Sequence, residues 1–215
     1  QRQTTPTPPW KGGDNTNIML AIVLSRKNVK EYDQMISLYT REQGKVEVLA
    51  KGIKKITSKN SSNLEILALV EIEIANGKEV DHLTKVQSIK VFKNIYADFD
   101  KIFIANYVVT IADANILSQE RDVRIFDLIV SFLEFLDSAT HINSLNLATG
   151  FIYKLWLCLG FSVSEEKYRI WLDANWPAIN ELGLSGEDQI KSYEYSIKFA
   201  ERHSCKHLAN FVKSD

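Results

Sequence analysis

The first part of the chain follows the hydrophobic pattern of β-strands. Two apolar runs are followed by segments in which apolar and polar side chains alternate, so that one face of each strand is apolar. Asn76-Gly77 lies between the last two segments and is typical of a tight hairpin, because both residues accept a positive φ. The pattern predicts five strands, over residues 18–24, 35–39, 45–50, 64–75 and 80–92. Five short strands with one long loop at 52–63 favour a small closed or nearly closed barrel of the OB-fold type.

After Asn94 the apolar residues recur with the period of an α-helix. Asp98 or Asp100 can cap the first helix, and Gly160 is suited to ending the third. Helices are expected over residues 99–117, 123–138, 145–159 and 187–204, with a further helix beginning at Ser164. The expected fold class is therefore α+β in two domains: an OB-fold barrel at 18–94 and an all-α domain at 95–215.

Residues 1–17 do not take part in this pattern. They are polar and contain three of the four prolines, so we expect a flexible tail rather than a secretory signal. No apolar run is long and uncharged enough to predict a membrane span. Cys158 and Cys205 cannot form a disulfide framework, which is typical of a reducing compartment such as the cytoplasm.

Charge is unevenly distributed along a chain whose net charge is only −1. Residues 20–60 hold nine Lys and Arg against four Asp and Glu, whereas residues 99–215 hold eleven against sixteen. A basic front region on a nearly neutral protein indicates a local anionic partner. Chance segregation of charge is the alternative.

The basic front region supplies the candidate binding residues. They lie around the first predicted loop, at the second and third strands and in the loop after the third strand, and their cationic side chains suit a phosphate backbone. The candidates are Arg26, Lys27, Lys30, Arg41, Lys45, Lys51, Lys54, Lys55 and Lys59. A solvated lysine edge that prevents aggregation of the sheet is the alternative. Tyr32 and Tyr39 are the only aromatic residues near these cations in the sequence, and each either stacks on bases or belongs to the core. Because so few aromatic residues are available for stacking, binding through the phosphate backbone is favoured over recognition of bases.

Catalytic and metal-binding patterns are weak. Glu71 and Glu73 share a solvated strand face, and His82 and His141 have no evident catalytic partner. His203-x-Cys205-x-His207 does not converge on one point of a helix, so we expect no metal site and no cofactor. We therefore do not expect an enzyme.

The segment around the lysines resembles a known family. Its pattern Tyr39-Thr40-Arg41-Glu42-x-Gly44-Lys45, followed by Ala50-Lys51-Gly52, is similar to the N-terminal signature of the bacterial RecO recombination mediators. Further markers in the same order are Leu69–Ile74, Leu83-Thr84, Phe92, Tyr107–Asp113, Ile125–Leu128 and Leu159-Gly160-Phe161. The resemblance covers about residues 19–170.

This resemblance implies a DNA-repair factor that is not an enzyme and acts in the bacterial cytoplasm at the nucleoid. It implies binding to single- and double-stranded DNA, annealing of complementary strands, and help in loading the recombinase during RecF-pathway gap repair. The implied protein partners are RecR and the C-terminal tail of the single-stranded-DNA-binding protein, with no membrane partner. The alternatives are an OB-fold protein that binds RNA and a protein-interaction adaptor.

The sequence departs from the family pattern in two places. Many members carry a Cys-x-x-Cys…Cys-x-x-Cys zinc site after the Leu-Gly-Phe turn, whereas this chain has Tyr168, Trp171 and Trp176 there, so we expect no zinc finger. Some members begin the third helix with arginines that suit an acidic tail, whereas this chain has Thr149-Gly150-Phe151 with Lys154 as the nearest cation.

Overall fold

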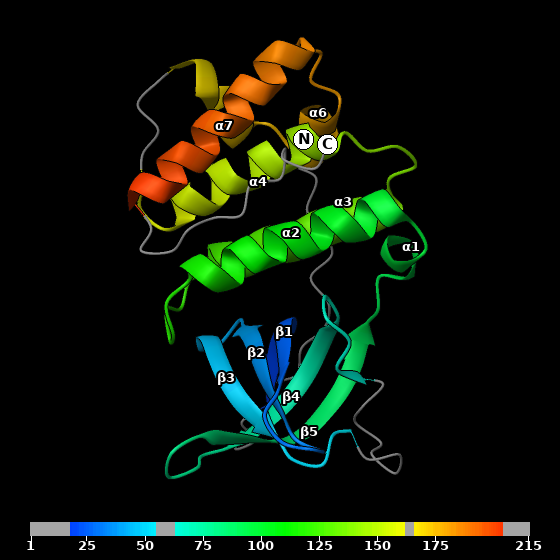
Figure 1. Ribbon diagram of the computed structural model, residues 1–215, viewed down its shortest axis with the longest axis vertical. Coiled ribbons are helices and arrows are strands. Elements are labelled where there is room, and N and C mark those ends of the chain that lie inside the picture. Colours follow the sequence, from blue (N-terminus) through cyan, green and yellow to red (C-terminus); the bar gives the residue numbers. More distant parts are fainter. Residues whose placement is uncertain (1–17, 55–62, 162–165, 204–215) are drawn as a thin grey trace, which may run out of the picture.

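The computed structural model describes residues 18–54, 63–161 and 166–203 (Figure 1). Its first part is a closed barrel with the strand order β1-β2-β3-β5-β4. The strands are β1 (Ile18–Asn28), β2 (Gln34–Thr40), β3 (Gly44–Ala50), β4 (Leu69–Ala75) and β5 (Asp81–Lys90). Neighbouring strands are antiparallel except β3 and β5, which pair in parallel and complete the barrel. The predicted OB-type barrel is confirmed.

The unbroken apolar run of β1 arises because both of its faces are covered. Ala21 and Val23 face the barrel interior, where they pack with residues such as Ile36 and Val48. Ile22 and Leu24 alternate with them and belong to the cluster that holds the helices. A strand that is buried on both faces has apolar residues at successive positions, so apolar and polar residues do not alternate along it.

Two details of the barrel differ from the prediction. The predicted strand at 64–75 begins only at Leu69, because Leu67 has a φ of +73° and interrupts the extended backbone, although Leu64 and Leu67 are buried. The predicted tight turn at Asn76-Gly77 is wrong as well. Residues 76–80 form a longer connection, and the Gly77 N–H donates to the Asp81 carboxylate at 3.1 Å.

The second part is helical, and Figure 1 shows it stacked above the barrel, with α2 lying across the end that faces it. Its elements are α1 (Lys93–Tyr96), α2 (Phe99–Asn115), α3 (Val123–Ser138), α4 (Ser144–Cys158), the 3-10 turn η2 (Glu166–Tyr168), α5 (Arg169–Asp173), α6 (Trp176–Asn180) and α7 (Gly186–His203). Asp98 caps α2, Asp122 caps α3 and Asn143 caps α4, each with its side chain accepting from backbone N–H groups. Gly160 follows α4 with a φ of +87°, as expected for a residue that ends a helix.

The helices pack around α4, which contacts α2, α3, α5, α6 and α7. Aromatic rings fill the space between them: Phe132 and Trp176 meet edge to face at 5.0 Å, and Tyr168 stacks on Tyr195 at 4.4 Å. The same hydrophobic cluster includes Ile22 and Tyr39 of the barrel, so barrel and helices share one core. The proposed domain boundary at residues 94 and 95 stays a prediction.

Several predictions concern parts of the chain outside the described residues. These are the tail at 1–17, Lys55 and Lys59, the helix start at Ser164, and Cys205 and His207. Among the helices that are described, none combines the length and apolar character that a bilayer crossing needs.

Candidate nucleic-acid interface

Four exposed predicted cations lie at the end of β1 and on two neighbouring loops of the barrel. The β1–β2 loop and the turn after β3 lie side by side, because β2 pairs with both strands and Gln34 is opposite both Asn28 and Ala50. Lys27 lies near the end of β1, Lys30 lies in the first loop, Lys51 and Lys54 belong to the second, and all four are exposed. None of the ion pairs formed among the described residues uses these four lysines. We call this set, Lys27, Lys30, Lys51 and Lys54, the lysine edge.

Hydrogen bonds fix the two loops to each other. The Gly52 N–H donates to the Asp33 carboxylate at 2.8 Å, and the Lys54 N–H donates to the Tyr32 carbonyl at 3.2 Å. Gly52 has a φ of +64°, a conformation that glycine adopts without strain. Within the first loop the Val29 N–H donates to the Asp33 carbonyl at 3.1 Å. The lysine edge therefore sits on an ordered backbone.

Arg26 differs from the four lysines, because its guanidinium is used within the barrel. It donates to the Gln34 side chain at 2.9 and 3.1 Å and to the Leu64 carbonyl at 2.9 Å, and it lies 3.8 Å from the Glu65 carboxylate. The side chain is only 17% exposed. These contacts indicate that Arg26 supports the β1–β2 loop and the segment before β4.

Arg41 points toward the helices. Its guanidinium lies 3.9 Å from the Asp127 carboxylate and its central carbon 5.8 Å from the centre of the Phe126 ring. Both charged side chains are exposed, so the pair contributes little to stability. Arg41 is at the junction of barrel and helices, away from the lysine edge along β2.

Lys45 requires a correction, because the structure places its side chain inside this junction and leaves it only 8% exposed. Its ammonium group forms an ion pair with Asp113 of α2 at 2.9 Å and donates to the carbonyls of Asp113 and Ile116. Ser37 and Ser25 donate to the same carboxylate at 2.7 and 2.9 Å. Burial alone would raise the pKa of Asp113, but the hydrogen bonds from Lys45 and Ser37 lower it below its usual value. We call Lys45, Asp113, Ser25 and Ser37 the junction lock and leave Lys45 out of the interface.

Backbone contacts strengthen the same junction. The Gln119 N–H donates to the Lys45 carbonyl at 2.8 Å, so the loop between α2 and α3 runs along the start of β3. Gly44 has a φ of +73°, and a Cβ atom there would lie 2.1 Å from the Glu120 carbonyl oxygen. The Gly44-Lys45 pair of the signature therefore serves close packing against the helices.

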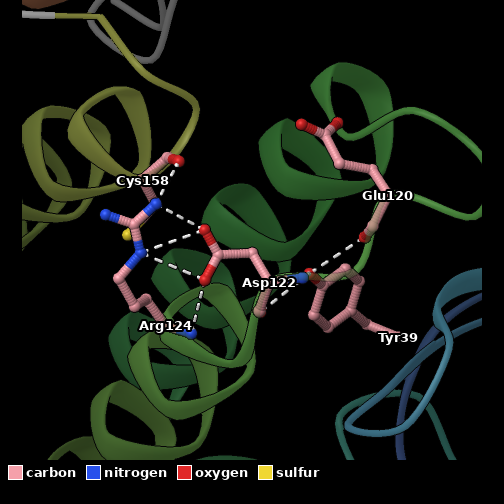
Figure 2. Close-up of polar contacts among 5 residues, drawn as sticks. All are labelled: Tyr39, Glu120, Asp122, Arg124 and Cys158. Carbon is pink, nitrogen blue, oxygen red and sulfur yellow. Dashed lines mark hydrogen bonds and ion pairs between the residues drawn. The ribbon is translucent and has the colours of Figure 1, made fainter.

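Figure 2 shows a second polar group at the junction, formed by Tyr39, Asp122 and Arg124. The Tyr39 hydroxyl contacts the Asp122 carbonyl at 3.0 Å and accepts from the Asp122 N–H at 3.1 Å. Burial raises the pKa of Tyr39 to about 12. Arg124 donates to the Asp122 carboxylate at 2.6 Å, which lowers the pKa of Asp122, and to the Cys158 carbonyl at 3.1 Å. These contacts tie β2 to the start of α3 and α3 to the end of α4.

Sequence reasoning did not find Asp113, Ser25, Ser37 or the pairing of Tyr39 with Asp122. A signal was present in β1, because an apolar strand without alternation indicates that its outer face is covered. Ile22, Tyr39 and Lys45 lie in one row across β1, β2 and β3. Cover over Ile22 therefore extends to Lys45.

The residues at the expected tail-binding position and at the position of the family's zinc site lie in the helical part. The Lys154 ammonium donates to the Leu172 carbonyl at 2.6 Å, and burial lowers the pKa of Lys154. Thr149, Gly150 and Phe151 are buried in α4. Tyr168, Trp171 and Trp176 pack into the helical core, and within the described residues no three His, Cys, Asp or Glu side chains cluster as a metal site.

Comparisons with known proteins match the barrel to one family model and the chain to several DNA repair proteins. Residues 18–92 match the family model of the recombination protein O N-terminal domain. The DNA repair protein RecO of Dehalococcoides mccartyi is 33% identical over 120 residues, which are 56% of this chain and 47% of the relative. RecO of a Nocardioides species is 31% identical over 124 residues, 56% of this chain and 50% of the relative.

A longer match is found with RecO of Clostridium novyi, which is 28% identical over 148 residues, 68% of this chain and 57% of the relative. The chain thus spans about half the length of the curated relatives it matches. Its barrel matches the RecO N-terminal family model, and the chain is similar to RecO proteins, which confirms the family resemblance expected from the sequence.

Proposed function

We propose that this protein is a DNA-repair factor of the RecO type that binds single- and double-stranded DNA through its lysine edge. The observation that carries the proposal is that a barrel matching the RecO family model holds four exposed lysines at the end of β1 and on two loops fixed to each other. Ammonium groups that contact phosphates release counterions and bind without sequence preference. This chemistry suits a factor that must act at any gap in a chromosome.

We further propose that the protein anneals complementary strands and assists recombinase loading at the bacterial nucleoid without catalysing a reaction itself. The names of its relatives support a role in DNA repair. RecR and the tail of the single-stranded-DNA-binding protein are the proposed protein partners. Lys154 does not support the tail site, because its ammonium is held by the Leu172 carbonyl. Pull-down with a tail peptide and with RecR tests the two partners separately.

DNA binding itself is tested by the dependence of affinity on salt. Replacing Lys27, Lys30, Lys51 and Lys54 with Ala should weaken binding to single-stranded DNA. It should also lower the log–log salt slope by about two to three units, at about 0.7 per lost phosphate contact. A matched variant removes four exposed cations of the helical part: Lys93, Arg169, Lys191 and Lys198. Equal slopes in the two variants would contradict the proposal.

A further inference from the structure

We propose that Tyr32 is a base-stacking residue, so that the lysine edge prefers unpaired nucleotides to a closed duplex. The inference rests on the proposed function, since it assumes that the lysine edge binds the phosphates. It adds a residue that recognises the base and therefore a preferred form of the nucleic acid.

The first support is the contrast between the two tyrosines of the basic region. Tyr39 is 0% exposed and belongs to the shared core, whereas Tyr32 is 44% exposed within a polar loop. An aromatic side chain of that exposure is not explained by packing of the core. The Tyr32 hydroxyl bonds to the Glu31 carboxylate, which ties the polar end of the side chain to the loop and raises the pKa of Tyr32.

The second support is the fixed position of Tyr32 relative to the lysines. Its carbonyl accepts from the Lys54 N–H at 3.2 Å, so the backbones of the two residues lie next to each other although 22 positions separate them in sequence. Lys30 precedes Tyr32 by two residues in the same loop. The backbone of Tyr32 is thus fixed next to Lys54 of the second loop and two residues from Lys30 of the first. A single strand presents phosphates and bases at alternating points, and this set of side chains offers a partner to each of them.

The form of the nucleic acid decides whether a base can reach the Tyr32 ring. In a duplex each base is paired and stacked between neighbours, so its face is not accessible to a side chain. An unpaired base can stack on an aromatic ring with little regard to its identity, because every base has a π-face. Phosphate contacts are available in both forms. Tyr32 should therefore add affinity only for single strands, gaps and ends.

The test compares a short oligothymidylate with an abasic oligonucleotide of the same length, which keeps the phosphates and lacks the bases. The full chain should bind the oligothymidylate at least about fivefold more tightly. Tyr32→Ala should bring this ratio close to one while leaving affinity for the abasic strand unchanged. Tyr32→Phe should keep the ratio and Tyr32→Leu should lose it. Phe99→Ala is the matched control, because Phe99 is an aromatic residue that is 79% exposed at the start of α2.

Each outcome separates the inference from the proposed function. A Tyr32→Ala variant that keeps the ratio would overturn the stacking role. Equal loss of affinity for both oligonucleotides would also overturn it, because it would mean that Tyr32 only positions the loop. If instead the lysine-edge variant keeps its affinity and salt slope, the phosphate-binding proposal fails, whatever the ratio measured for Tyr32→Ala.

Discussion

The lysine edge and the junction lock place lysines of one signature in opposite environments. Lys51 and Lys54 are exposed on a turn fixed by backbone hydrogen bonds, whereas Lys45 lies at the start of β3, the strand before that turn, and is buried under α2. The ammonium groups at the edge are available to a ligand, and the buried one is bound by Asp113. A basic motif therefore cannot be interpreted from its charge alone, because burial decides whether the charge serves binding or assembly.

Removing the acid of the junction lock should have the largest effect. Asp113→Ala leaves the Lys45 ammonium buried with carbonyl partners only, and breaking a buried pair in this way costs about 3 kcal/mol or more. Urea unfolding should show this loss in the free energy of unfolding. A matched change at the exposed pair of Lys191 and Glu187, Glu187→Ala, should cost less than about 0.5 kcal/mol. Similar losses for the two variants would show that the buried pair of the junction lock contributes no more stability than an exposed pair.

The glycine of the signature gives the next largest effect. Gly44→Ala imposes a strained positive φ and a clash with the Glu120 carbonyl, and it should destabilise the protein by about 2–4 kcal/mol. Gly160→Ala separates these two causes, because Gly160 has a φ of +87° and a Cβ atom added there would meet nothing within 4 Å. It should cost only about 1–2 kcal/mol. Equal costs in thermal or urea unfolding would mean that close packing at Gly44 contributes nothing.

A smaller effect follows from the lowered pKa of Asp113. A carboxylate whose folded pKa lies below its unfolded value of about 3.9 stabilises the fold above that pH. The stabilisation is lost as pH falls through the folded pKa. The free energy of unfolding of the wild type should therefore decrease from about pH 5 toward pH 3 more steeply than that of Asp113→Asn. Parallel pH profiles of the two proteins would contradict the assigned pKa shift.

The sequence predicted the elements well where local physics determines them. The alternation in β3, the cap before α2 and Gly160 after α4 are each local signals, and the corresponding elements are present. The predicted start of β4 is wrong because Leu64 and Leu67 are buried like strand residues, whereas the positive φ of Leu67 interrupts the extended backbone. The pattern of apolar residues indicates which residues are buried, but it does not indicate their backbone conformation.

The candidate site could be predicted only in part for a related reason. The exposed lysines follow from their position in polar loops, and the family signature indicated those loops. The burial of Lys45 depends on Asp113, which is 68 residues away in the chain. No local pattern connects two such residues, although the covered outer face of β1 indicates where a contact of this kind is to be found.

If the lysine edge binds DNA and Lys45 holds the barrel and the helices together, two variants should separate the two roles. The measurement is the DNA salt slope and the free energy of unfolding of each variant. We expect the lysine-edge variant to lose salt slope and keep its stability. Lys45→Met, assayed where it is folded, should lose stability and keep the slope. A Lys45→Met protein of normal stability with a lowered slope, beside a lysine-edge variant with an unchanged slope, would contradict this assignment of roles.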